Sequence, residues 1–170
     1  MMINVLHIDD DETMGVLVKK SLESGQSGIK VVSVTSSLES LRLLLNPHDF
    51  QCVLSDYQMP EMDGMRILIE LRSRGDDLPF LFLTGQGNED IAREAFKAGA
   101  HDYFTKEVGF AHYDRIANSI EQAVRTYQSE RSKADAEKKL RESQERYRML
   151  FEKMLNAFAL HEVILGSDGR

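Results

Sequence analysis

Short apolar runs alternate with amphipathic stretches along the first two-thirds of the chain. Each run has the length of a buried strand, and each is followed by a segment with apolar residues at helical spacing. The runs cover residues 3–8, 29–34, 52–55, 79–83 and 102–105. No hairpin signal joins any two of them. Strands that alternate with helices in this way predict an α/β fold, with a doubly wound, five-stranded parallel sheet and right-handed crossovers.

The helices between these strands have recognisable ends. Thr13 is expected to cap the first helix, Ser36 or Ser37 starts the second, and Asn46-Pro47 stops it. The apolar positions at helical spacing are Val16, Leu17 and Leu22 in the first helix, Leu38, Leu41, Leu44 and Leu45 in the second, and Ile91, Ala92, Ala95 and Phe96 in the fourth.

The chain changes character after Gly109. Residues 110–154 contain neither proline nor glycine, which predicts a continuous helix of roughly 65 Å that one small domain cannot bury. Its first part, with Ile116, Ile120, Ala123 and Tyr127, is expected to pack on the sheet. Residues 128–153 carry eight basic and six acidic side chains. A lone solvated helix is one interpretation, but a 3-4-3-4 spacing favours a dimeric coiled coil. That seam contains Leu140, Ser143, Tyr147, Leu150 and Met154.

Composition narrows the class of protein. The hydrophobic content of 42% supports a packed core, and the net charge of −7 argues against a nucleic-acid partner. A single cysteine, Cys52, excludes an internal disulfide framework. No apolar run is long enough to span a membrane, and the N-terminus has no secretory signal. We therefore expect a cytoplasmic protein that does not associate with membranes.

Polar groups follow the ends of four predicted strands. Asp9 and Asp10 follow the first, Asp56 the third, Thr84 the fourth and Lys106 the fifth. In a sheet of order 2-1-3-4-5, the carboxyl ends of these strands meet in one pocket. Three carboxylates suit Mg²⁺, while an ammonium and a hydroxyl suit the oxygens of a phosphoryl group in transfer. One carboxylate can then act as a nucleophile and become an aspartyl-phosphate.

Four motifs at these strand ends identify a family. They are V-L-H-I-D-D-D-E, L-S-D-Y-Q-M-P-E-M-D-G, F-L-T-G and A-G-A-H-D-Y-F-T-K. In this order and at these spacings, they resemble the receiver domain of two-component response regulators, which has the flavodoxin-like sheet order 2-1-3-4-5. The resemblance covers residues 3–127, so we predict a receiver domain at 1–127 and a helical or coiled-coil linker at 128–154.

The resemblance implies a role for each residue of the pocket. Asp56 is the phosphoacceptor. Asp10 and Asp56 ligate Mg²⁺ directly, with help from the backbone carbonyl of Gln58, and Asp9 acts through water. Thr84 and Lys106 contact the phosphoryl group. The switch pair consists of Thr84 and Tyr103.

Two departures from the family pattern concern the loops around the pocket. Glu107 stands where a proline usually follows the lysine, and Gly85 follows Thr84 where a larger or small apolar residue is common. Both substitutions put the local loop geometry and the switch in doubt. Gln58 and Gln86 occupy positions that influence the phosphate lifetime in receivers.

The C-terminal residues have a weaker resemblance. The segment E-R-Y-R-M-L-F-E at 145–152, followed by an apolar stretch and Asp168-Gly169, looks like the entry of a PAS sensory domain. We therefore interpret residues 155–170 as a fragment of a PAS-like domain, with one or two strands at 157–165 and a turn, and the chain as the front of a longer protein.

Three functional hypotheses follow. The leading one is a phosphoaccepting receiver that takes its phosphoryl group from a histidine kinase or a phosphotransfer protein and signals along a homodimeric helix. Such a domain is not an enzyme in its own right, although it assists its own Mg²⁺-dependent phosphorylation and dephosphorylation. The second is a dimerising scaffold with an idle pocket. The third is the N-terminal receiver of a hybrid, PAS-containing histidine kinase.

Overall fold

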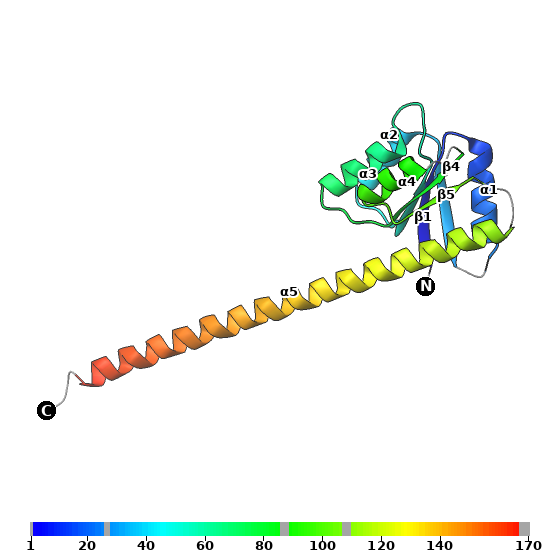
Figure 1. The fold of residues 1–170 in the computed structure, drawn as a ribbon. Helices are drawn as coiled ribbons and strands as arrows, with labels where there is room; N and C mark the ends of the chain where they lie inside the picture. Colours follow the sequence, from blue (N-terminus) through cyan, green and yellow to red (C-terminus); the bar gives the residue numbers. More distant parts are fainter. Residues whose placement is uncertain (1, 26–27, 86–88, 107–109, 167–170) are drawn as a thin grey trace. The chain divides into compact units, whose positions relative to one another are not determined.

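In a computed structural model of the chain, the described residues form an alternating series of strands and helices (Figure 1). The structure describes residues 2–25, 28–85, 89–106 and 110–166. The strands are β1 (Ile3–Ile8), β2 (Ile29–Val34), β3 (Cys52–Ser55), β4 (Phe80–Thr84) and β5 (Asp102–Thr105). The helices are α1 (Glu12–Glu23), α2 (Ser37–Leu44), α3 (Gly64–Ser73), α4 (Glu89–Lys97) and α5 (Phe110–Gly166).

All five strands run parallel in the order β2-β1-β3-β4-β5, which confirms the predicted fold class. The register aligns Ile8 of β1 with Ser55 of β3, and Thr84 of β4 with Thr105 of β5. The residues that follow these strands therefore emerge at one edge of the sheet. Strands β3 and β4 are buried along their whole length, as expected of strands that are covered on both faces.

Helices cover both faces of the sheet (Figure 1), and an apolar cluster lies on each face. Helices α1 and α5 cover one face, where Val18, Leu22, Ile116 and Ile120 are buried against β1, β3 and β4. Helices α2, α3 and α4 cover the other face. Helix α4 contributes one fully buried side chain, Ala95, and is the least embedded of the three.

The predicted helix starts and buried faces need three corrections. Asp11, not Thr13, is the N-cap of α1, because its carboxylate accepts the Thr13 backbone N–H at 2.8 Å. An acid at a helix N-terminus also interacts favourably with the helix dipole, which offsets the repulsion within the acidic run. Val16 and Leu38 face solvent, and the buried face of α2 consists of Ser37, Ser40 and Leu44. Phe96 is 49% exposed, although it shares the predicted face of α4.

Helix α5 belongs to two compact units of the chain, Met1–Tyr127 and Gln128–Arg170. Within the first unit, Val124 is fully buried, while Tyr127 is only partly covered. The strands predicted for 157–165 are wrong, because α5 continues through Gly166. A change from helix to strand would need a residue that ends the helix, and residues 110–165 contain neither glycine nor proline.

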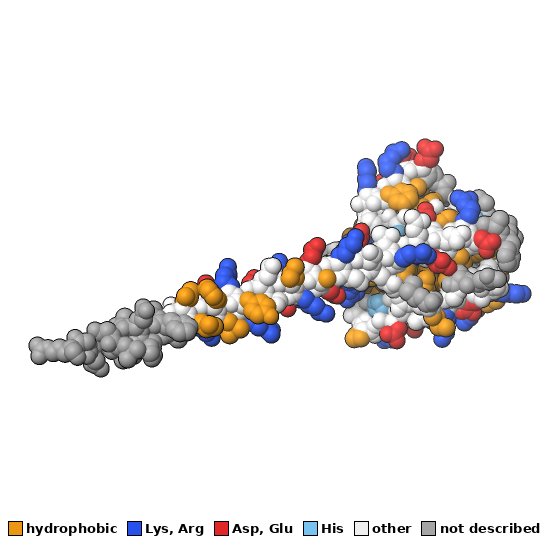
Figure 2. Space-filling model, turned by 90° about the horizontal axis from the view of Figure 1, so that it is seen from below, with side chains coloured by type: hydrophobic (Ala, Val, Ile, Leu, Met, Phe, Trp, Pro, Cys, Tyr) orange, Lys and Arg blue, Asp and Glu red, His pale blue; other side chains and the backbone are white. Residues whose placement is uncertain are grey.

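The second unit exposes apolar side chains on its helix. Leu140, Tyr147, Leu150 and Met154 of the predicted seam are all more than half exposed. Figure 2 shows hydrophobic side chains gathered along the part of the helix that precedes the grey residues. In the described part of the chain, no helix has both the length and the apolar character needed to cross a membrane.

Candidate functional site

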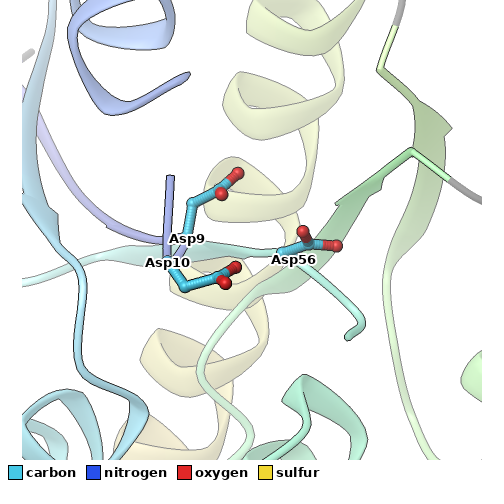
Figure 3. Close-up of side chains that lie close together, drawn as sticks. All are labelled: Asp9, Asp10 and Asp56. Carbon is cyan, nitrogen blue, oxygen red and sulfur yellow. The ribbon is translucent and has the colours of Figure 1, made fainter. Parts of the chain in front are cut away.

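The carboxyl ends of β1 and β3 bring three carboxylates together. The Asp56 backbone N–H donates to the Ile8 carbonyl oxygen at 2.7 Å and fixes the two strand ends side by side. One carboxylate oxygen from each of Asp9, Asp10 and Asp56 lies within 4.8 Å of the others. Figure 3 shows these three side chains close together. Asp9 and Asp56 are buried, while Asp10 is exposed. The acidic cluster is thus open on one side.

Lys106 enters this cluster from the end of β5. Its backbone N–H donates to the Thr84 carbonyl oxygen at 2.7 Å, which ties the β5 end to the β4 end. Its ammonium lies 2.6 Å from Asp56 Oδ2 and 2.7 Å from Asp9 Oδ2. One ammonium therefore bridges two buried carboxylates that belong to different strands.

The charges of the cluster are not balanced. Burial raises the pKa of Asp9 above its ordinary value, despite the hydrogen bond from Lys106. Burial would by itself lower the pKa of Lys106, but its bonds to Asp56 and Asp9 outweigh that effect and raise it. Lys106 is therefore charged at neutral pH. Among the described residues, three carboxylates face this single contacting ammonium.

The carboxylate of Asp56 is held at both oxygens. Lys106 binds Oδ2, while Oδ1 accepts the backbone N–H of Tyr57 at 2.6 Å and, more weakly, that of Gln58 at 3.4 Å. The chain then turns closely over the strand end. The Gly64 N–H donates to the Tyr57 carbonyl oxygen at 3.0 Å, and the position of a Gly64 side chain is filled by the Asp56 carbonyl oxygen.

The predicted site residues occupy one edge of the sheet. Thr84 is 1% exposed at the end of β4, and Lys106 follows β5 directly. Gln58 lies in the loop after Asp56 and is exposed. Tyr103 is half-buried, and its ring packs 6.4 Å from that of Phe82. Glu107, one of the two departures from the family pattern, and Gln86, a position linked to the phosphate lifetime, lie outside the described residues.

Two residues near the site had no predicted role. His7 is 1% exposed, its Nε2 lies 3.8 Å from Asp9 Oδ2, and its Nδ1 lies 3.4 Å from Ser33 Oγ. Burial and the charge of Lys106 lower the His7 pKa to about 4, so the imidazole is neutral at pH 7 and adds no cation to the cluster. Tyr57 is the second. The sequence offered one signal for each of them. His7 is a polar residue inside an apolar strand, and Tyr57 is an aromatic residue directly after Asp56.

The donor set fits a hard divalent cation. Carboxylate and backbone carbonyl oxygens are the ligands that Mg²⁺ prefers, and it keeps several waters, which an open side of the site permits. The cluster also carries an excess of negative charge that such an ion would neutralise. Asp9, Asp10 and Asp56 are the residues that would hold it.

The fold and the acidic pocket define a class, the doubly wound signalling modules whose functional groups lie at the carboxyl edge of the sheet. Residues 5–129 match the family model described as the response regulator receiver domain, and the chain belongs to this family. It is a receiver domain of the kind found in response regulators, consistent with two-component phosphoacceptor signalling.

Individual relatives agree with this assignment. The transcriptional regulatory protein FixJ of Bradyrhizobium diazoefficiens is 34% identical over 119 residues, which are 69% of this chain and 55% of FixJ. The transcriptional regulatory protein MalR of Bacillus subtilis is 27% identical over 136 residues, 80% of this chain and 57% of MalR. The chain therefore spans a little over half the length of these relatives. A receiver domain structure from Clostridium thermocellum covers 75% of this chain and 98% of its own, with 31% identity and a TM-score of 0.66.

The close turn at Gly64 predicts a sharp contrast between two glycines. A Gly64→Ala side chain would meet the Asp56 carbonyl oxygen, Ser55 Oγ at 2.7 Å and Phe82 at 3.0 Å. We expect it to lower the free energy of unfolding by about 1–3 kcal/mol, as overpacking does. Among the described residues, a Gly85→Ala side chain meets only Lys106 Cδ at 3.9 Å, and this variant should change stability by less than about 0.5 kcal/mol. Urea unfolding of both variants tests this; equal effects would contradict the close approach.

The charge imbalance predicts a cation-dependent effect of Lys106. Lys106→Ala leaves Asp9 and Asp56 without their counter-charge and should cost about 1–3 kcal/mol of stability in EDTA. Mg²⁺ should then raise the melting temperature of this variant more than that of the unchanged protein, because the ion replaces the lost positive charge. Lys133→Ala, at an exposed position of α5, is the control. An equal Mg²⁺ effect in all three proteins would show that the ion binds elsewhere.

Proposed function

We propose that this receiver domain accepts a phosphoryl group on Asp56 and transmits the change through α4, β5 and α5. The observation that carries this proposal is the ammonium of Lys106, which lies 2.6 Å from the Asp56 carboxylate at the rim of a buried acidic cluster. Receiver domains interact with histidine kinases or phosphotransfer proteins. A phosphohistidine on such a partner is therefore the proposed donor.

The transfer needs one nucleophile and several positioning groups. A carboxylate oxygen of Asp56 attacks phosphorus, a P–O bond forms, and the P–N bond to the donor imidazole breaks. The imidazole leaves with the electron pair and takes a proton from solvent. Lys106 then neutralises phosphoryl oxygens in addition to the Asp9 carboxylate, and the hydroxyl of Thr84 donates to the new group. Mg²⁺, when bound, supplies charge neutralisation for the carboxylates and the incoming phosphate together.

The switch is proposed to involve Thr84 and Tyr103. Thr84 lies in β4 beside β5, the strand that carries both Tyr103 and, at its end, Lys106. Movement of the Thr84 hydroxyl toward a phosphoryl group would open space for the Tyr103 ring and so alter the α4–β5 surface. The single fully buried side chain of α4 makes that helix the element of the domain that shifts most easily.

We further propose that residues 128–154 of α5 form a homodimer. Exposed apolar side chains follow one side of the helix, and Phe151 and Leu155 widen the predicted seam to an arc of about 140° on a helical projection with 3.6 residues per turn. An apolar stripe of this width is typical of a helix that packs against a partner. The members of this arc are Tyr147, Leu150, Phe151, Met154 and Leu155.

We also propose a cellular location for the protein and a domain context for its C-terminal residues. We place the protein in the cytoplasm, where histidine kinases donate phosphoryl groups to their partners. Residues 155–170 are still proposed as the beginning of a PAS-like domain, although residues 155–166 are helical and give no strand support for it.

If Asp56 is the phosphoacceptor, its replacement should abolish phosphoryl labelling of the chain. The purified chain, incubated with Mg²⁺ and a small-molecule phosphodonor such as acetyl phosphate, should gain one phosphoryl group that is labile to alkali and to hydroxylamine, as measured by intact-protein mass spectrometry. Asp56→Ala should abolish it, and EDTA should do so in the unchanged protein.

Asp49→Asn, at an exposed acid outside the cluster, is the matched control and should label normally. Persistent labelling of Asp56→Ala would overturn the assignment of the phosphoacceptor. An unlabelled wild-type chain that is nevertheless a dimer would instead favour the idle scaffold.

The apolar arc predicts a contrast between two neighbouring residues. Leu150→Glu places a charge within the arc and should weaken a dimer at least about tenfold, because the charge loses its hydration in the interface. Met149→Glu is matched in exposure, 55% against 54%, but lies outside the arc and should have little effect. Light scattering across a concentration series, with and without beryllofluoride, measures both. A monomeric wild-type chain in both conditions would contradict the dimer, and equal effects of the two variants would contradict the arc.

A further inference from the structure

Tyr57 occupies a position that joins the proposed phosphoacceptor to α4. Its backbone N–H donates to Asp56 Oδ1 at 2.6 Å, and the backbone N–H of Gln58 is the second donor to that oxygen among the described residues. Its ring packs against Phe82, with the centroids 5.8 Å apart and the planes at 62°. Backbone and side chain of one residue thus contact the acid at one end and the aromatic core at the other.

Phe82 gives Tyr57 a fixed support. Phe82 is fully buried in β4, beside Ser55 of β3, and it packs 5.1 Å from Phe80. The same ring supports Tyr103 at a centroid distance of 6.4 Å. Tyr57 and Tyr103 therefore contact the same ring of the core, and a shift of either one changes the space that is left to the other.

The side chain of Tyr57 packs against the same apolar cluster as Ala95 of α4. Burial raises the pKa of the Tyr57 phenol, and the negative charges of Glu94 and Asp63 raise it further. Glu94 lies on α4, on its exposed surface. Tyr57 thus shares an apolar cluster with the helix whose position the proposed switch changes.

Phosphorylation changes the hydrogen bond at the other end. Before phosphorylation, the Tyr57 N–H donates to a charged carboxylate, and such charge-assisted bonds are about twice as strong as neutral ones. In an acyl phosphate, the charge of that carboxylate moves to the phosphoryl oxygens, so the bond at Oδ1 weakens. The loop between β3 and α3 is then free to shift, and the ring of Tyr57 shifts with it.

From this arrangement, we infer that Tyr57 is a positioning residue that couples the state of Asp56 to α4 by a route that does not pass through Thr84. The inference rests on the proposed function of Asp56. It differs from the proposed switch in its starting atom, because the signal begins at the backbone bond to Oδ1 and not at a hydroxyl drawn toward the phosphoryl group.

Amide hydrogen exchange of residues 89–97, measured with Mg²⁺ and with or without beryllofluoride, tests this inference. Thr84→Ala removes the switch hydroxyl, and we expect this variant to keep a reduced change in α4 exchange. In the double variant Thr84→Ala, Tyr57→Leu, the remaining change in α4 exchange should be smaller by about fivefold or more. ¹⁹F NMR of bound beryllofluoride confirms occupancy in each protein.

Three further variants guard against a simple folding defect. Glu94→Gln removes an exposed charge of α4 that raises the pKa of the Tyr57 phenol, and in the Thr84→Ala background it should also reduce the α4 response. Glu89→Gln, an exposed acid of the same helix, should not. Tyr147→Leu, at an exposed tyrosine of α5, is the control for loss of a tyrosine.

The outcomes separate this inference from the function on which it rests. If the wild-type chain neither binds beryllofluoride nor accepts a label, the proposed function fails. If it does both, but Thr84→Ala alone abolishes the α4 response, no second route exists and the inference is wrong. It is also wrong if the response of Thr84→Ala is unchanged by Tyr57→Leu and by Glu94→Gln.

Discussion

The ammonium of Lys106, between the carboxylates of Asp9 and Asp56, is the interaction on which the arrangement of this domain depends. It is drawn to that position because two acids, both buried, emerge from adjacent strands with no other contacting cation among the described residues. The raised pKa of Asp9 indicates that one ammonium does not fully compensate the cluster. A pocket in this state attracts a divalent cation and, once the cation is bound, tolerates an incoming phosphoryl group.

The sheet explains why the charges lie at its edge. Strands β3 and β4 are buried along their whole length, so a charged side chain within them would lose its hydration without compensation. His7 is the titratable side chain of β1, and its lowered pKa keeps it neutral at physiological pH. The acids and the lysine are placed just after the strands, where Asp10 and Lys106 keep contact with water and Lys106 provides a counter-charge for the buried Asp9. The same apolar region of the sheet supplies the rings of Phe80 and Phe82, which are fully buried and pack against each other.

Helix α5 obeys a different constraint in each unit of the chain. Up to Val124, its apolar residues are buried against the sheet and stabilise the domain. From Tyr147 to Leu155, a comparable number of apolar side chains remain more than half exposed. Ion pairs along a solvated helix add only tenths of a kilocalorie per mole each, and they cannot compensate for exposed apolar area. This excess of exposed apolar surface is the physical argument for a partner. The width of the apolar arc favours a packed bundle face over a narrow seam.

The sequence by itself determined the order of the elements, the parallel sheet and the residues that meet at its edge. Buried parallel strands need continuous apolar runs, and the first polar residue after each run must lie at the edge; this is why Asp56, Thr84 and Lys106 could be placed from their positions alone. Local competition between neighbouring residues was harder to read. The cap of α1 is Asp11 where Thr13 was predicted, and residues 157–165 are helical where strands were predicted. In each case, both alternatives fit the same local sequence pattern. Only the tertiary structure decided which groups contact one another: the two bonds of Lys106, the neutral His7 and the ring of Tyr57 on Phe82. Such contacts depend on side-chain direction and on the distances between strands, and no spacing along the chain encodes them.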